Sequence, residues 1–502
     1  MRALAFLGQL IGLRLIPGAV IASGLSIRGR NHLCCTIGRL TQYEPFPQIA
    51  LRTVRTMTAS PANVVRADPL GIMPRYARRG VPGRDVAASD AGIMPLVLPG
   101  EEVDALGLAL LLTLGFSLGD RTVFRDIRRL EPGETISHAD SGQSGRARPV
   151  RPNESSPSDS QLLELFRNAL ERYPSRQMPI VPLSGGRDSR LILLGLRSMG
   201  LRPRVILTGG GLRASSDAIV AARLAARLDE TIEGVQPLAF DMGREIWRHQ
   251  AQNFESLEHG WFLGVALRAR ALGGPVTDGL GLGVLATGSL MKPEAIALWR
   301  AGATDELADW TIEHAAGIGD EFLSKLAMAG VPLASADEVR HELVRTLRGL
   351  DHLPNPLGAF SLFHWTRRGI SASPYGLLNP RQTFAPLCDA QLAAATLAIE
   401  LDEAVKSDWR ERILNRFDDL SIPFSDAAGN YWPVRKARAG LYERLRGRLE
   451  WSKFSRELPT NLQALAGSLA SNGGVRWTFQ RSALGLIASM RAATVVNGDR
   501  NF

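Results

Sequence analysis

The feature that most constrains the fold of this 502-residue chain is a six-residue run, Ser184-Gly185-Gly186-Arg187-Asp188-Ser189. The apolar residues 177–183 precede it and predict a short strand, and residues 190–199 have apolar side chains at helical spacing. Two glycines between a strand and a helix let the backbone approach a phosphate closely. The helix N-terminus adds free N–H groups and the positive end of its dipole. The run therefore predicts a phosphate-binding loop.

The side chains of this run suggest how it would bind. Ser184 and Ser189 add hydroxyl donors, whereas the Asp188 carboxylate suits a magnesium ion bound to the phosphate. The run is neither a Walker A sequence nor a GxGxxG dinucleotide loop. The alternative is a tight strand-to-helix turn in which Asp188 is an ordinary carboxylate of the first helical turn.

The order of predicted elements indicates the fold class. A second strand, 204–207, is followed by glycines 209–211 and by a helix over 217–228. Strand, glycine-rich loop and helix, twice in succession, are typical of a parallel α/β sheet with right-handed crossovers. Residues from 305 onward are mostly helical in pattern.

The region before the loop contains a linker and shorter elements. Residues 138–159 have almost no apolar side chains and separate an N-terminal segment from the rest. Residues 122–136 predict strand, turn and strand, with Pro132-Gly133 in the turn. Helices are predicted over 101–118 and over 160–172, the latter with Ser160 as N-cap.

Composition excludes several classes of protein. The three cysteines, Cys34, Cys35 and Cys388, have neither a disulfide framework nor zinc-ligand spacing. The net charge of +9 is spread along an arginine-rich chain, so a dedicated nucleic-acid surface is not expected. The apolar residues 3–25 are interrupted by Arg14 and Pro17, which favours a buried element over a signal sequence. We expect a cytoplasmic protein with no membrane partner.

The six-residue run resembles the SGGxDS pyrophosphate-binding loop of the N-type ATP pyrophosphatases, and its surroundings are similar to the asparagine synthetase branch. Residues 205–209 and 384–389 resemble the adenosine-contacting strand and the Arg-x-Pro-Phe-Leu-Asp segment of that family. Residues 67–71 and 122–133 resemble stretches of its class II glutaminase-like domain. The resemblance covers roughly residues 60 to 425 and is specific at the loop.

This resemblance implies four regions. Residues 1–137 would form a degenerate α+β glutaminase-like domain of the Ntn type, and 138–159 the linker. Residues 160–425 would form a parallel-sheet ATP pyrophosphatase domain of the HUP type with a mostly helical C-terminal part. Residues 426–502 would be a basic, helical extension.

The resemblance also implies ATP and Mg²⁺ as cofactors and a set of site residues. Asp188 and Asp278 would bind magnesium, and Lys406 would stabilise charge in the transition state. Lys406 on a solvated helix face is the alternative, with Lys436 as a second candidate. Nucleotide-binding residues would be Leu183, Ser184, Gly185, Gly186, Asp188, Ser189, Thr208 and Gly209.

Two positions depart from the family pattern. Arg2 stands where glutamine-dependent synthetases have a nucleophilic cysteine, and arginine cannot perform that attack. Gly283 stands where the family has an aspartate for a second magnesium. Loss of the cysteine is shared by beta-lactam synthetase and lasso-peptide cyclases, which close an amide within one substrate.

The sequence therefore predicts an ATP-dependent carbon–nitrogen ligase. It would convert a substrate carboxylate to an acyl-adenylate with release of pyrophosphate, and an amine would then displace AMP. A precursor peptide is the candidate substrate, and a protease or leader-binding protein is the candidate partner. The alternatives are an asparagine synthetase-like enzyme that uses ammonia and a catalytically impaired scaffold. The pair Arg367-Arg368 fits either an anionic ligand or a solvated surface.

Overall fold

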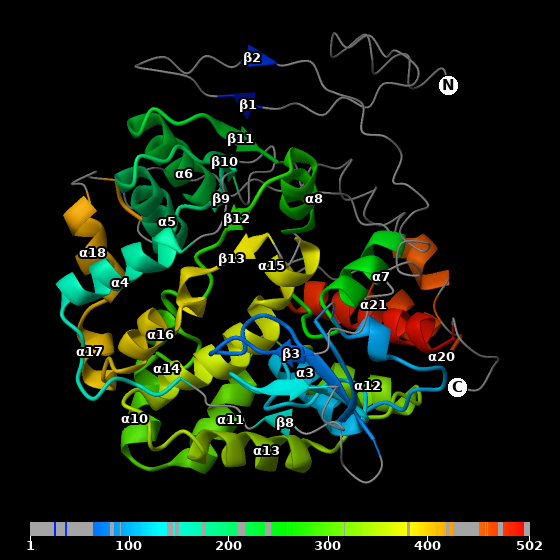
Figure 1. Ribbon diagram of the computed structural model, residues 1–502. Coiled ribbons are helices and arrows are strands. Elements are labelled where there is room, and N and C mark those ends of the chain that lie inside the picture. Colours follow the sequence, from blue (N-terminus) through cyan, green and yellow to red (C-terminus); the bar gives the residue numbers. More distant parts are fainter. Residues whose placement is uncertain are drawn as a thin grey trace.

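Five parallel strands form the centre of the main sheet, with an antiparallel pair at one edge (Figure 1). The spatial order is β13-β12-β9-β10-β11-β1-β2. Numbered along the chain, the parallel strands have the order 3-2-1-4-5, read from β11 to β13. The strands are β9 (Ile180–Leu183), β10 (Arg204–Leu207), β11 (Ile232–Gly234), β12 (Val276–Thr277), β13 (Thr383–Phe384), β1 (Leu25–Ser26) and β2 (Thr36–Ile37).

The computed structural model describes a defined part of the chain. It covers residues 25–26, 36–37, 64–80, 85–90, 92–137, 144–145, 150–172, 177–207, 216–235, 242–258, 260, 262–315, 317–378, 382–417, 422–424, 451–456, 458, 460–469 and 475–495. The predictions made for residues 3–25, for Arg2, Cys34 and Cys35 and for Lys436 fall almost entirely outside these ranges, since only Leu25 is included.

The order of the parallel strands reverses between β9 and β12. The chain leaves β9 toward β10 on one side, whereas β12 and β13 lie on the other side of β9. In open parallel sheets with this reversal, ligands bind outside the carboxyl ends of the two strands that flank it. The predicted parallel α/β sheet is thus confirmed, and its order places the loop after β9 at the reversal.

Alternating side chains of the strands are buried on both faces of the sheet. Val181, Leu183 and Val205 pack with helices α4 (Asp159–Glu171), α5 (Arg187–Ser198) and α6 (Ser216–Arg227). Ile180, Ile206 and Val276 pack on the opposite face against α8 (Phe262–Leu272). Strand side chains point to alternate faces, so apolar residues at consecutive positions require helices on both sides.

The N-terminal part of the described chain forms two small antiparallel sheets. One has the order β3-β7-β8 and the other β5-β4-β6. The predicted turn at Pro132-Gly133 is present, with Gly133 at φ 73°, but the strands on either side of it belong to different sheets. The strands are β3 (Val64–Arg66), β4 (Tyr76–Arg79), β5 (Asp85–Ser89), β6 (Ile127–Arg129), β7 (Thr135–Ser137) and β8 (Ser144–Gly145).

Helices make up most of the remaining structure. Helix α3 (Ala105–Leu114) ends at Gly115, which has φ 87°, and packs with α11 and α13. The helices are α7 (Met242–Ala251), α9 (Val284–Thr287), α10 (Pro293–Arg300), α11 (Thr304–His314), α12 (Asp320–Met328), α13 (Ala336–Arg348), α14 (Pro356–Phe360), the π-helix η2 (Ser361–Ile370), α15 (Ala372–Leu377), the 3₁₀ helix η3 (Pro386–Cys388), α16 (Ala390–Leu397), α17 (Leu401–Lys406), α18 (Trp409–Phe417), α20 (Thr460–Ser468) and α21 (Val475–Val495).

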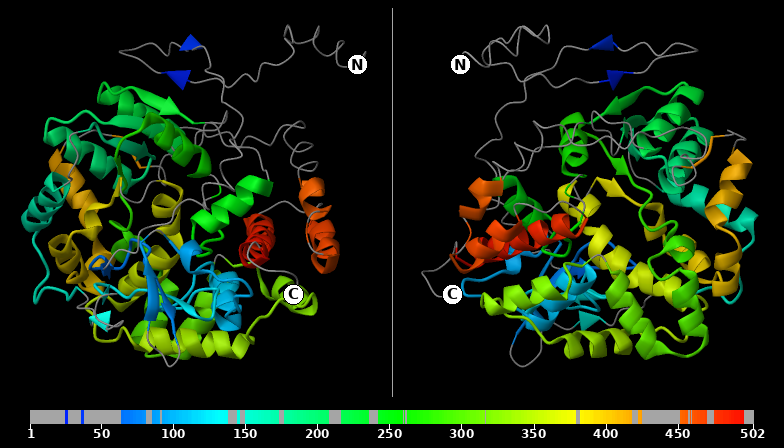
Figure 2. Two further views of the ribbon diagram at one scale, coloured as in Figure 1. Left: turned by 45° about the vertical axis from the view of Figure 1, so that its right-hand side comes forward. Right: turned by 180° about the vertical axis from the view of Figure 1, so that it is seen from behind.

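The C-terminal helices α20 and α21 lie beside α7 and α12 rather than beside the main sheet (Figures 1 and 2). Their apolar side chains share a core with the N-terminal sheets, in which Leu462 and Leu486 pack with Tyr76 and Phe124.

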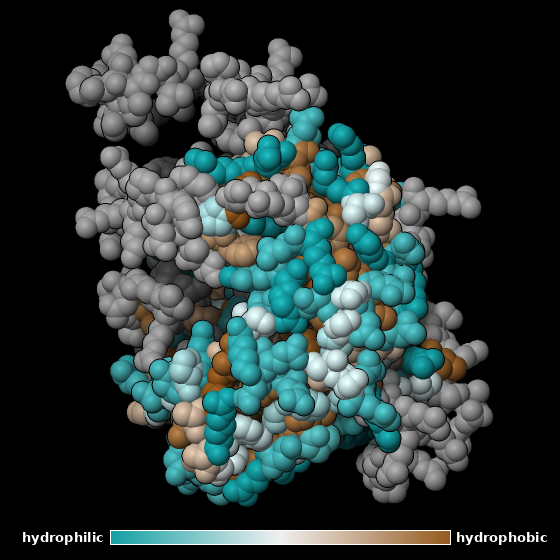
Figure 3. Space-filling model, turned by 90° about the vertical axis from the view of Figure 1, so that its left-hand side faces the viewer, coloured by the Kyte–Doolittle hydropathy of each residue, from teal (hydrophilic) through white to brown (hydrophobic). Residues whose placement is uncertain are grey.

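Among the described residues, no helix combines the length and the apolar character needed to cross a membrane. The face over α4, α17 and α18 is mostly hydrophilic (Figure 3).

Several helix starts differ from the sequence prediction: α3 begins at Ala105 instead of residue 101, α6 begins one residue earlier than predicted, and α4 and α5 also begin earlier. Ser158, not Ser160, is the N-cap of α4, because the Ser158 hydroxyl accepts from the Gln161 N–H and the Gln161 side chain accepts from the Ser158 N–H. Helix α5 begins at Arg187, three residues earlier than predicted. Asp188 and Ser189 are therefore part of the first helical turn.

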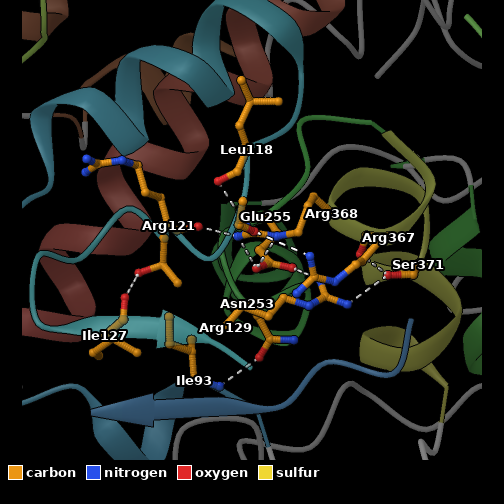
Figure 4. A network of polar contacts seen from close by, with 12 residues as sticks. Ile93, Leu118, Arg121, Ile127, Arg129, Asn253, Glu255, Arg367, Arg368 and Ser371 are labelled. Atoms are coloured by element: carbon orange, nitrogen blue, oxygen red, sulfur yellow. Dashed lines mark hydrogen bonds and ion pairs between the residues drawn. The ribbon is translucent and has the colours of Figure 1, made fainter. Parts of the chain in front are cut away.

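Arg367 and Arg368 are buried, so the alternative of a solvated surface was wrong for this pair. Figure 4 shows them where η2 meets the N-terminal sheets. Arg368 donates to Glu255 at 2.7 Å, and Arg129 of β6 pairs with the same carboxylate. Arg367 donates to the carbonyl oxygen of Leu130 at 2.7 Å. Buried guanidinium groups need acceptors on several sides, and here they are one carboxylate and the carbonyl groups of neighbouring loops.

We expect Glu255→Gln to lower the free energy of unfolding by about 3–5 kcal/mol, because it removes the charge that two buried arginines share. The side chains of Arg129 and Arg368 are fully buried, so water cannot compensate. Urea unfolding would measure the loss. Glu321→Ala, which breaks an exposed pair with Lys325, is the control and should unfold at the wild-type urea concentration. Equal midpoints for the two variants would contradict this interpretation.

We also expect stability to fall in mild acid because of His364 on η2. Burial, with Arg367 and Arg368 nearby, lowers the pKa of His364 to about 3, and its Nδ1 accepts from the Gly119 N–H at 3.4 Å. The unfolded histidine binds its proton near pH 6.5, so the stabilisation is present above that pH and is lost as the pH falls toward 3.

His364→Asn should reduce this acid sensitivity by about 1.4 kcal/mol for each pH unit between 6 and 4. Unfolding midpoints measured across that range would test it, with the exposed His352→Asn as the control. If the stability of the variant depends on pH as steeply as that of the wild type, groups other than His364 cause the loss of stability in acid.

Candidate nucleotide-binding site

The predicted phosphate-binding loop lies at the carboxyl end of β9 and leads directly into α5. The Ser184 N–H donates to the Ser189 Oγ at 3.0 Å, and the two hydroxyl oxygens are also 3.0 Å apart. The Gly186 N–H donates to the Ser184 Oγ at 3.2 Å. Gly186 is the helix N-cap, at φ −81°, and contributes no side-chain cap. Ser184 and Ser189 therefore close the loop, and the glycine leaves the helix N-terminus open to an anion.

A second loop, following β12, packs against the first. The Asp278 N–H donates to the Phe384 carbonyl oxygen at 2.8 Å, which joins the ends of β12 and β13. A Cβ on Gly279 would lie 2.6 Å from the Asp188 Cβ and 2.9 Å from its carbonyl carbon. A glycine is needed here because the two loops approach so closely. The contact brings Asp188 and Asp278 to the same end of the sheet.

Helix α18 supplies the cation that contacts Asp188. The Arg410 Nη1 donates to Asp188 Oδ1 at 2.5 Å, and Nη2 donates to Asp408 Oδ2 at 2.5 Å. Burial by itself lowers the pKa of Arg410, but Asp188 and Asp408 together raise it above its usual value. Burial raises the pKa of Asp188, an effect that Arg410 opposes. The guanidinium stays charged and fixed between two carboxylates.

Two further arginines of α5 fasten residues 422–424 to the loop. The guanidinium groups of Arg187 and Arg190 lie 4.2 and 4.4 Å from the Phe424 ring centroid. Arg190 donates to the carbonyl oxygen of Ile422 at 2.7 Å, and Arg187 pairs with Glu411 of α18. Arg187 and Arg190 thus have partners in the protein and serve to order this side of the site.

Asp188 and Asp278 are the two carboxylates of this site that could hold a magnesium ion. Burial raises the pKa of Asp278 to about 6, and the charge of Asp188 adds to the shift while the Leu280 N–H opposes it. Two neighbouring carboxylates in such surroundings are stabilised by a cation. Magnesium commonly takes one or two carboxylates and completes its octahedron with water and phosphate oxygens. The described residues contain no cluster of three or more His, Cys, Asp or Glu side chains that could hold a metal without such help.

The structure places the other predicted site residues as follows. Leu183 is fully buried, so it could reach a nucleotide only through its backbone. Lys406 is exposed at the end of α17, and the cation beside Asp188 is Arg410. Asp389 caps α16 by accepting the N–H groups of Gln391 and Leu392. Thr208 and Gly209 lie outside the described residues.

Sequence reasoning missed Arg410 and Gly279. Arg410 stands in an ordinary amphipathic helix, and its spacing from the loop is 222 residues. Gly279 precedes Gly281 and Gly283. In this stretch only Gly283 was considered, because the family that the sequence resembles has an aspartate there. A glycine directly after a strand-end aspartate was the available signal for a close backbone approach.

Comparisons with known proteins returned no match, either to a protein-family model or to a curated protein.

We expect Gly279→Ala to destabilise the protein by about 1–3 kcal/mol, since the new methyl group would overlap backbone atoms of Asp188 that cannot move without the first turn of α5. Urea unfolding is the measurement. Gly234→Ala at the end of β11 is a matched control, because a Cβ there would have no heavy atom within 4 Å apart from its neighbours in the chain. If both variants unfold at the same urea concentration, the two loops are not in close contact.

Proposed function

We propose that this chain is an ATP-dependent ligase that forms an amide bond through an acyl-adenylate, with peptide macrolactam formation of the lasso-cyclase type as its reaction. The observation that supports the proposal most is the position of the loop. Residues 184–189 and Asp278 lie together at the carboxyl ends of β9 and β12, where the strand order reverses. This is the place where parallel α/β sheets bind nucleotides.

The chemistry uses the loop as a leaving-group site. A substrate carboxylate oxygen attacks the α-phosphorus of ATP, and the bond to the β-phosphate breaks. Pyrophosphate leaves toward the N-terminus of α5, where N–H groups and the Ser184 and Ser189 hydroxyls bind it. A substrate amine then attacks the acyl carbon, loses a proton and displaces AMP. Magnesium, when bound by Asp188 and Asp278, would neutralise phosphate charge.

A scaffold that binds nucleotide without turnover is the second candidate. One observation favours it: the carboxylate of Asp188 is already paired with Arg410, and Arg187 is paired with Glu411. In this state the charges of the site satisfy one another. An asparagine synthetase-like reaction with ammonia would use the same loop.

Thermal unfolding with and without Mg-ATP tests the site. At a hundredfold excess over the dissociation constant, binding to the folded state should add about 2.7 kcal/mol to its stability. Asp188→Asn should lose most of this shift, whereas Asp320→Ala, which removes a first-turn carboxylate from the distant α12, should keep it. No shift in the wild-type protein would overturn the proposed nucleotide site.

Pyrophosphate release separates the ligase from the scaffold. Wild-type protein with Mg-ATP and a peptide that carries both a carboxylate and an amine should release pyrophosphate and AMP in equal amounts. If the protein binds ATP but releases no pyrophosphate with any peptide or with aspartate, the scaffold is favoured. Release with aspartate and ammonia alone would favour asparagine synthesis.

A further inference from the structure

Arg410 is tied into the site more firmly than an ordinary surface ion pair. Its side chain is only 5% exposed. Besides Asp188 and Asp408, its Nη2 donates to the Thr287 hydroxyl of α9 at 3.2 Å. Its Nε donates to Asp408 Oδ1 at 3.0 Å, so the two oxygens of Asp408 bind one edge of the guanidinium as a bidentate pair. Asp408 holds the cation in position even if Asp188 turns to another ligand.

Gly283 provides the space that Arg410 occupies. A Cβ at position 283 would lie 1.8 Å from the Arg410 Nη1 and 1.9 Å from its Cζ. No side chain at position 283 is compatible with the guanidinium in this place. The neighbouring Leu282 carbonyl accepts from the Trp409 indole N–H at 3.1 Å, which fixes α18 against the same loop. The glycine and the arginine are therefore a matched pair.

The same geometry decides whether a second metal ion fits. The family that the sequence resembles has an aspartate at this position for a second magnesium, and here the guanidinium occupies the place of such a side chain. A guanidinium supplies a positive charge and several donors but no metal ligand. Asp278 and the carboxylate of Asp188, once Arg410 releases it, would be the ligands of one ion. With Arg410 in this place, position 283 offers no ligand to a second ion.

We propose that Arg410 is a built-in counter-ion that takes the place of a second magnesium, so that the site works with one divalent ion. This inference rests on the proposed ATP site. With nucleotide bound, Asp188 turns toward the single metal ion, and the released Nη1 of Arg410 donates to a phosphate oxygen. Arg410 thus acts as a charge-positioning residue beside the leaving pyrophosphate.

Manganese is the probe for this test, because its electron paramagnetic resonance counts bound ions. The wild-type protein with ATP should bind one Mn²⁺ per nucleotide. Arg410→Gln should weaken ATP binding on the order of 10- to 100-fold, since a charged donor to phosphate is lost. Arg412→Gln is the matched control: it lies on the same helix but pairs with Asp159 and Glu403, so it should bind ATP as the wild type does.

A double variant, Arg410→Ala with Gly283→Asp, should bind two Mn²⁺ per nucleotide, because it exchanges the cation for a metal ligand. A purely structural arginine would not change the number of ions. Two Mn²⁺ per nucleotide in the wild type, or equal ATP affinity in Arg410→Gln and Arg412→Gln, would overturn the proposal. Absence of ATP binding in the wild type would overturn the nucleotide site itself, and the inference with it. If Arg410→Gln does not fold, the wild-type count still decides.

Discussion

One carboxylate, shared by two fully buried guanidinium groups, connects the N-terminal sheets with η2 and the segment after α7. Glu255 follows α7, Arg129 belongs to β6 of an N-terminal sheet, and Arg368 belongs to η2. None of these side chains can leave the others without stranding a charge in the interior. A buried ion network adds little net stability, but it permits few alternative arrangements. The N-terminal sheets are therefore held in one position against η2 and the segment that follows α7.

Paired charges also organise the candidate site. The candidate site lies where the strand order reverses, because β12 lies on the opposite side of β9 from β10. The loops that end β9 and β12 meet there with two carboxylates, and α18 adds Arg410 between Asp188 and Asp408. Each carboxylate is costly to bury alone, so a cation must accompany it. The pairing of Asp188 with Arg410 is the electrostatic feature that distinguishes this site.

Local patterns were sufficient for much of the fold. The strand before the loop, the helix after it and the following strand were all predicted, because apolar spacing reports which faces are buried. The start of α5 was missed because Gly186 caps it without a side-chain bond. The Ser158 cap was missed because Ser158 and Ser160 are equally good caps, and the position of Gln161 decides between them.

Charged residues were predicted less well than apolar ones. Arg367 and Arg368 follow each other in an unremarkable segment, yet both are buried against loops from the N-terminal part. Lys406 was predicted as the cation of the site because lysine is rare in this chain. Arg410, four residues later, is the cation that contacts the loop. The amino-acid order determined the strand–loop–helix around residues 184–189 and the parallel α/β class, because both depend on neighbouring residues. The partners of each buried charge, including the pairing of Asp188 with Arg410, depend on contacts between segments more than 100 residues apart, so only the folded chain could decide them.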